Sequence, residues 1–139
     1  MQVLVYPDVP TMSQAAADDG AALIRQALAE RGEANLIVAT GASQLTMLSR
    51  LSQAEGVDWR RVVGFHLDEY IGLPFAHKGS FRGYLWKHFV SQLPAPLKQF
   101  HFLDGEGDAQ AECRRVGEIL ASSPIDVAFV GIGENGHLA

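Results

Sequence analysis

The sequence has very little cysteine and no long apolar run. Its single cysteine, Cys113, excludes a disulfide within the chain and favours a reducing compartment. No apolar stretch approaches the roughly 18 residues that a membrane-spanning helix needs. The first residues also lack the basic-then-apolar pattern of a secretion signal. We therefore expect a cytoplasmic protein that has no membrane partner.

Positive charge is also scarce. Lys and Arg number 11 against 16 Asp and Glu, which gives a formal net charge of −5. This balance argues against nucleic acid, or an anionic membrane surface, as the main partner. A phosphorylated small molecule stays compatible with it, because a few local hydrogen-bond donors can outweigh the sign of the whole protein.

Metal-ligand spacing is absent too. The five histidines are scattered, without the paired spacing that zinc sites use, so we expect no metal ion. Repeats and low-complexity segments are missing, while 47% of the residues are hydrophobic. A chain of 139 residues with that composition can bury a substantial core. The simplest organisation is one domain over residues 1–139.

Strand and helix patterns alternate along the chain. Apolar runs predict strands at 2–6, 35–39, 61–67, 99–103 and 125–130. We expect a first helix that begins at Thr11 or Ser13 and ends at Arg31, before Gly32. Further helices are expected after the caps Ser43, Ser80 and Asp108. The last of them should bury Cys113, Val116, Ile119 and Leu120.

This order predicts an α/β fold of the Rossmann-like, doubly wound type. Its sheet should be mainly parallel, with helices on both faces, because strand–helix–strand crossovers are right-handed. Ligands of such sheets bind beyond the carboxyl ends of the strands. Three loops start at such ends, at 40–43, 68–72 and 131–137. We therefore expect them to form one shared pocket.

The first loop, Thr40-Gly-Ala-Ser43, joins a buried strand to a helix N-terminus. Gly41 permits a tight turn, and the free amides of Ala42 and Ser43 would point at an anion. The hydroxyls of Thr40 and Ser43 are further donors. An ordinary helix cap is the simpler interpretation of this segment alone, since it lacks the lysine and the several glycines of a P-loop.

The second loop contains adjacent carboxylates, Asp68 and Glu69. Successive strand side chains point to opposite faces, so both can face one ligand only if the strand has already ended. Either could move protons on a bound sugar. A solvated acidic loop is the alternative interpretation. His66, just before them, is better explained as a packed strand histidine than as a ligand.

The third loop is rich in glycine. Gly131, Gly133 and Gly136 let a ligand approach the backbone, and Asn135 lies two residues before His137. A histidine acts as an acid or a base near neutral pH, and a neighbouring amide can fix its tautomer. A Gly-rich turn with a surface histidine is the alternative. A dinucleotide site would need a helix and a ribose-binding acid after the glycines.

Together these segments resemble the glucosamine-6-phosphate deaminase family, within the superfamily that includes 6-phosphogluconolactonase. The matching stretches are Ala39-Thr-Gly-Ala-Ser43, Phe65-His-Leu-Asp-Glu-Tyr-Ile-Gly-Leu-Pro74, Ser80-Phe-Arg82 and Gly131-Ile-Gly-Glu-Asn-Gly-His-Leu-Ala139. They follow the family's order and cover essentially the whole chain. The lactonases usually carry arginine at the position of Tyr70.

The resemblance implies conversion of an aldose amine 6-phosphate to a ketose phosphate and ammonia, without a cofactor. It implies that Asp68 moves a proton from C2 to C1, and that His137 opens the sugar ring. Asn135, an aspartate in many members, would orient that imidazole without stabilising its cation by charge. The implied substrate-binding residues are Thr40, Gly41, Ala42, Ser43, Glu69, Gly133 and Gly136.

The resemblance also sets the expected extent of the protein. The family places a glutamate and basic phosphate ligands beyond the last matching stretch. We therefore expect these 139 residues to form the N-terminal part of the fold, with an incomplete sheet, and to be poorly stable and inactive in isolation. Family members often form homo-oligomers. A sugar-phosphate lactonase and a non-catalytic sugar-phosphate sensor are the alternative functions.

Overall fold

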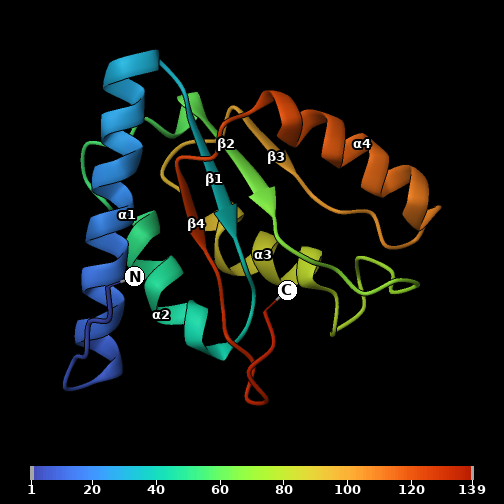
Figure 1. Cartoon of the computed structure of the whole chain (residues 1–139), viewed down its shortest axis with the longest axis horizontal. Helices are drawn as coiled ribbons and strands as arrows, with labels where there is room; N and C mark the ends of the chain where they lie inside the picture. The colour runs from blue at the N-terminus through green and yellow to red at the C-terminus, as the bar shows by residue number, and fades with distance from the viewer. Residues whose placement is uncertain (1, 139) are drawn as a thin grey trace.

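The protein is described by a computed structural model over residues 2–138. Helices and strands alternate in the predicted way (Figure 1). In chain order the elements are α1 (Val9–Arg31), β1 (Ala34–Val38), α2 (Ala42–Ser52), η1 (Trp59–Arg61), β2 (Val62–His66), α3 (Phe81–His88), η2 (Val90–Gln92), β3 (Gln99–His101), α4 (Ala109–Ser122) and β4 (Val127–Phe129). None of the helices within residues 2–138 combines the length and apolar character that crossing a membrane requires.

The four strands form one parallel sheet in the order β3-β2-β1-β4. Strand β1 is central, and its Leu36 lies opposite Gly64 of β2 and Val127 of β4. The chain thus builds the sheet outward from β1 through β2 to β3, and then returns to the other side of β1 for β4. This reversal is the topological switch of doubly wound folds, where ligands bind. The predicted fold class is confirmed.

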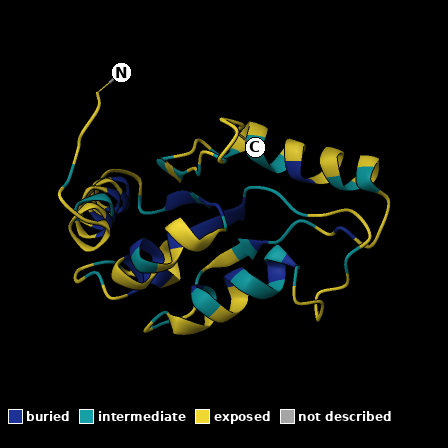
Figure 2. Cartoon of the chain, turned by 90° about the horizontal axis from the view of Figure 1, so that it is seen from below, coloured by how far each residue is buried: buried dark blue, intermediate teal, exposed yellow. Residues whose placement is uncertain are grey.

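Helices cover both faces of the sheet. The side chains of Ala34, Leu36 and Val38 point to one face, where they join the buried residues of α1, α2 and α3 in the main core. Helix α4 lies on the opposite side of the sheet from α2 and α3 (Figure 2). Of the four residues expected to be buried on α4, only Val116 is, and Cys113 is exposed. One helix on that face leaves part of the sheet uncovered.

The first helix begins earlier than predicted. Asp8, rather than Thr11 or Ser13, is its N-cap, and the Asp8 carboxylate accepts a hydrogen bond from the Thr11 amide at 2.8 Å. Gly32 ends the helix in the left-handed region, at φ 81°, as the sequence indicates.

The predicted strand at 2–6 is wrong. No strand is assigned to these residues, and Val3, Leu4 and Val5 are exposed. A strand needs a neighbour for its backbone hydrogen bonds, and residues 2–6 pair with neither edge strand of the sheet, β3 or β4. The apolar composition that predicted the strand carries no information about that neighbour.

Candidate active site

A cavity of about 230 Å³ lies at the carboxyl edge of the sheet, beyond the ends of β1, β2 and β4. All three predicted loops contribute to its wall. The lining residues are Ala39, Thr40, Gly41, Ser43, Leu67, Asp68, Phe81, Gly131, Ile132, Gly133 and His137. The structure therefore brings the three loops together at the topological switch of the sheet, as expected.

The turn at 40–43 delivers the N-terminus of α2 to this cavity. Gly41 is the N-cap, with φ 115°, a value that favours glycine, and no side chain caps the helix. Ser43 belongs to the first helical turn, so its predicted role as the cap is wrong. The first amides of α2 are consequently available to an anion. Thr40, Gly41 and Ser43 line the cavity, whereas Ala42 does not.

Helix α3 contacts this turn through a hydrogen bond. The Tyr84 hydroxyl donates a hydrogen bond to the Gly41 carbonyl oxygen at 2.7 Å. Tyr84→Phe removes the bond and leaves the ring in place, so the turn should lose part of its order. We expect the dissociation constant for a sugar phosphate to rise roughly three- to tenfold, since a neutral hydrogen bond is worth about 1 kcal/mol. Isothermal titration calorimetry measures this, with Tyr6→Phe, outside the cavity wall, as control.

Asp68 lies two residues beyond the end of β2, where strand alternation no longer fixes its direction. Asp68 lines the cavity and is half-buried. Burial raises its pKa, and the neighbouring Glu69 charge raises it further, while His137 lowers it. The opposing influence of His137 reflects the position of both side chains on one cavity wall. A carboxyl group with a raised pKa is suited to accept and return protons.

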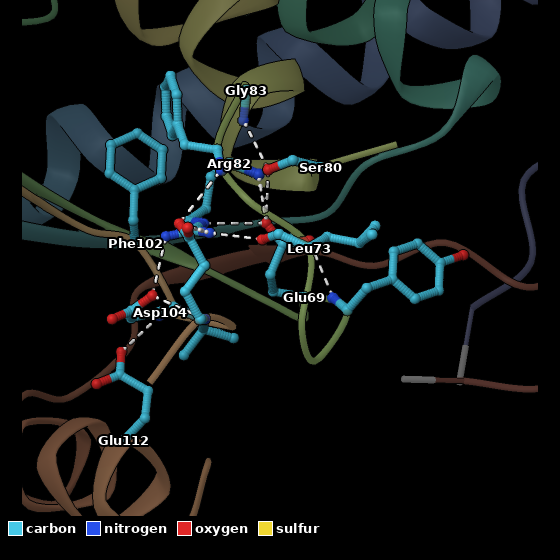
Figure 3. Close-up of polar contacts among 12 residues, drawn as sticks. Glu69, Leu73, Ser80, Arg82, Gly83, Phe102, Asp104 and Glu112 are labelled. Atoms are coloured by element: carbon cyan, nitrogen blue, oxygen red, sulfur yellow. Dashed lines mark hydrogen bonds and ion pairs between the residues drawn. The ribbon is translucent and has the colours of Figure 1, made fainter. Parts of the chain in front are cut away.

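Glu69 occupies a different environment from Asp68. Figure 3 shows Glu69 within a network of polar contacts. Its side chain is 2% exposed, and its oxygens accept hydrogen bonds from the amides of Phe81 and Arg82 at 3.0 and 2.8 Å. Glu69 does not line the cavity. Its acceptor capacity is used inside the protein, and the expectation that it binds substrate stays a prediction.

The Gly-rich loop shapes the surroundings of His137. A Cβ atom at Gly133 would lie 2.2 Å from the His137 ring, so only glycine leaves room for the imidazole in this position. Asn135 Oδ1 contacts His137 Nδ1, which fixes the tautomer with the proton on Nδ1 and the lone pair on Nε2. Gly136 adopts φ 82° within the turn. Neither Asn135 nor Gly136 lines the cavity, so Asn135 acts on it only through His137.

His66 is a packed strand histidine, as predicted. It is buried, its ring meets Phe102 edge-to-face at 6.4 Å, and its Nε2 has no hydrogen-bond partner within the described residues. Burial lowers the pKa of His66 to about 4; Glu69 opposes this shift and Arg82 adds to it. The ring is therefore neutral in the folded protein at pH 7.

This neutral histidine predicts a loss of stability in mild acid. The unfolded chain binds a proton at His66 near pH 6.5, whereas the folded chain does so only near pH 4. The unfolded state thus binds more protons between these values, so stability is full above pH 6.5 and falls as the pH drops toward 4. Between pH 7 and 5 we expect His66 to lower the free energy of unfolding by about 2 kcal/mol. Urea unfolding at both pH values measures it. His66→Gln should flatten the dependence, while His77→Gln, which replaces an exposed histidine, should not.

Apolar cavity residues were not identified from the sequence. Leu67, Phe81 and Ile132 supply the non-polar part of the wall. Phe81 is the first residue of α3, and nothing in the sequence indicates that this helix begins beside the end of β2. The sequence does contain a signal for Ile132. An apolar residue between two glycines has no neighbouring side chains to shield it, so it is a candidate for contact with a ligand. Among residues 2–138, no group of three His, Cys, Asp or Glu side chains is arranged to hold a metal ion.

Comparisons with known proteins agree with this geometry. Residues 7–139 match the family described as glucosamine-6-phosphate isomerases/6-phosphogluconolactonase. The chain is 35% identical over 143 residues to a glucosamine-6-phosphate deaminase of Geobacillus sp. (strain WCH70), covering 99% of this chain and 55% of that protein. It is 37% identical over 131 residues to glucosamine-6-phosphate deaminase 2 of Giardia intestinalis, covering 88% and 50%.

Solved structures give the same result. A monomeric glucosamine-6-phosphate deaminase superposes with a TM-score of 0.88 at 28% identity, covering 99% of this chain and 58% of that one. A 6-phosphogluconolactonase, described as putative, from Neisseria gonorrhoeae FA 1090 has a TM-score of 0.77 at 28% identity, covering 96% and 58%. The chain spans about half the length of the curated relatives it matches. On this evidence the chain belongs to the glucosamine-6-phosphate isomerase/6-phosphogluconolactonase family.

Proposed function

We propose that this chain supplies the substrate cavity of a glucosamine-6-phosphate deaminase, which converts glucosamine 6-phosphate and water to fructose 6-phosphate and ammonia. The observation that carries the proposal is one cavity shared by Asp68, His137 and the N-terminus of α2. The deaminase relatives, at 35–37% identity, give the substrate class.

Each cavity group has a step in this proposal. His137 Nε2 accepts the proton of the C1 hydroxyl and returns it to the ring oxygen as the bond between that oxygen and C1 breaks, which gives the open-chain aldehyde. Asp68 then removes the C2 proton and delivers it to C1, while a proton passes from the C2 amine to the C1 oxygen, so that the amine becomes an imine. Water adds to C2 and ammonia leaves, which produces the ketone. No oxidation takes place, and the carboxyl group of Asp68 ends as it began.

The amides at the start of α2 are proposed to hold the phosphate. A helix N-terminus carries a partial positive charge, and its amides have no partners within the helix. Thr40 and Ser43 stand in the same wall and add hydroxyl donors. This local arrangement suits a phosphate despite the net charge of −5.

An assay for ammonia release from glucosamine 6-phosphate tests the proposal. It should be run on the full reading frame that contains these residues and on residues 1–139 alone, since relatives are about twice as long. We expect the full protein to release ammonia, and residues 1–139 alone to release none. A full protein that leaves glucosamine 6-phosphate unchanged would contradict the proposal.

The lactonase alternative has one observation in its favour, the likeness to the Neisseria gonorrhoeae structure at 28% identity. Against it stands Tyr70, at a position where lactonases usually carry arginine. Hydrolysis of 6-phosphogluconolactone, followed by acid release, distinguishes the two. We expect no acceleration above the spontaneous rate, and a sensor would accelerate neither reaction.

A further inference from the structure

A buried ion pair lies beside the candidate active site. Arg82 Nε is 3.3 Å from Glu69 Oε2, and the two side chains are only 9% and 2% exposed. The guanidinium also donates to Asp104 at 3.0 Å, to Glu106 at 2.8 Å and to the Leu73 carbonyl oxygen at 2.9 Å (Figure 3). Arg82 thus binds both ends of the loop that follows β2, through Glu69 and Leu73, and ties them to the segment after β3.

The Glu69 carboxylate has hydrogen-bond partners in addition to its ion pair with Arg82. It accepts hydrogen bonds from the Ser80 hydroxyl at 3.0 Å and from the first two amides of α3. Burial would raise the pKa of Glu69, but these bonds and one from the Tyr70 amide lower it. Glu69 is therefore ionised, and it serves as an acceptor for the N-terminus of α3.

The far end of the same loop packs closely against the segment after β3. The Gly72 amide donates to the Gly105 carbonyl oxygen at 2.6 Å, and a Cβ atom at Gly105 would lie 2.2 Å from the Tyr70 carbonyl oxygen. Asp68 is preceded by Leu67, whose amide donates to the Val38 carbonyl oxygen at 3.1 Å, and it is followed directly by the anchored Glu69. Its backbone is fixed on both sides.

We infer that Glu69 and Arg82 are positioning residues for Asp68: their buried pair holds the loop after β2 so that the Asp68 carboxyl faces the cavity it shares with His137. This inference depends on the proposed role of Asp68 as the proton-transfer group. The position needs to be accurate, because an error of about 1 Å in a reacting group can cost roughly 100-fold in rate.

Glu69→Gln lowers the pKa of Asp68 simply by removing a nearby charge, so the deciding titration is that of Arg82→Lys, which keeps its charge and loosens the loop. The charge of Glu69 and the burial that the loop imposes both raise the pKa of Asp68. Other titratable and charged groups lie on the elements packed around it. They are His137 on the Gly-rich loop, Arg82 on α3, and Asp104 and Glu112, which line a neighbouring cavity together with Asp68.

The experiment compares Glu69→Gln and Arg82→Lys with the unchanged protein and with Glu118→Gln. Glu69→Gln keeps the size of the side chain and removes its charge, while Arg82→Lys keeps the charge but loses the planar fork that reaches several partners at once. Glu118→Gln makes the same chemical change as Glu69→Gln at an exposed position of α4, outside the network. Carbon-13 NMR of the carboxyl carbons gives the titration midpoint of Asp68, and an ammonia assay gives kcat and KM.

We expect Glu69→Gln to lower the Asp68 midpoint and to reduce kcat roughly 10- to 100-fold with a smaller change in KM. Glu118→Gln should alter neither. A folded Glu69→Gln protein with an unchanged midpoint and kcat would overturn the inference. Arg82→Lys decides whether or not Glu69→Gln folds, since a loosened loop exposes Asp68 to water and lowers its midpoint, and an unchanged midpoint contradicts us.

The NMR measurement needs no turnover, so it separates the two proposals. An Asp68 midpoint that responds to Arg82→Lys in a protein that releases no ammonia supports the positioning of Asp68 and refutes the deaminase proposal. Ammonia release together with an Asp68 midpoint that does not respond supports the deaminase proposal and refutes the positioning of Asp68.

Discussion

Replacing Asp68 with asparagine is expected to reduce ammonia release from glucosamine 6-phosphate about 1,000-fold. Positioned acid–base groups contribute roughly 10²- to 10⁴-fold to such reactions, and an amide cannot accept the C2 proton. Binding should change little, since the phosphate is assigned to the amides of α2 and the side chain keeps its size. Steady-state kinetics give kcat, and calorimetry with the substrate analogue glucitol 6-phosphate gives the affinity.

The pH profile provides an independent check of the same residue. Asp68 must be ionised to take the proton, so activity should fall as the pH drops through its raised pKa. Asp108→Asn is the matched control, because Asp108 caps α4 outside the cavity and asparagine is an equally good cap. Turnover by Asp68→Asn at the rate of the control would exclude Asp68 as the acid–base group. Equal loss of binding and turnover would make it a ligand instead.

The largest expected effect on stability belongs to Trp59. Trp59 is 1% exposed and packs edge-to-face on Phe89, with ring centroids 5.9 Å apart. Trp59→Ala leaves a cavity in the main core and should lower the free energy of unfolding by about 3–5 kcal/mol. Because whole domains are stable by only about 5–15 kcal/mol, this change removes a large part of the total.

The second tryptophan is a matched control for this prediction. Trp86 on α3 is 50% exposed, so Trp86→Ala should cost less than about 1 kcal/mol. Urea unfolding followed by circular dichroism measures both variants. Equal midpoints for Trp59→Ala and Trp86→Ala would show that the packing around Trp59 contributes no stability.

The fold was largely predictable because its signals are local and repeated. Each buried strand, such as 35–39, is a short apolar run followed by a helix start, and right-handed crossovers then determine a parallel sheet. The segment 2–6 has the same composition, yet it forms no strand in the described residues. Apolar character indicates burial in a sheet only when a neighbouring strand is available, and that depends on the rest of the fold.

The candidate site shows the same division between local and distant information. Asp68, His137 and the 40–43 turn follow from their places at strand ends, and the structure brings them to one cavity. The separation of Asp68 from Glu69 did not follow, since the donors that bind Glu69 come from α3, 11 to 13 residues later. Two adjacent carboxylates look alike in a sequence until the partner of one of them is known.

The pairing of β4 has a consequence for the timescale of motion at His137. Within residues 2–138, strand β4 is joined to the sheet through β1 alone, over a register of three residue pairs, whereas β1 and β2 share five. Segments with few backbone hydrogen bonds open locally at low free energy. The amides of β4 and of the loop after it should therefore exchange with solvent before those of β1 and β2. The loop that carries His137 accordingly follows an edge strand that opens more readily than the central pair, while Asp68 follows β2, a strand of that central pair.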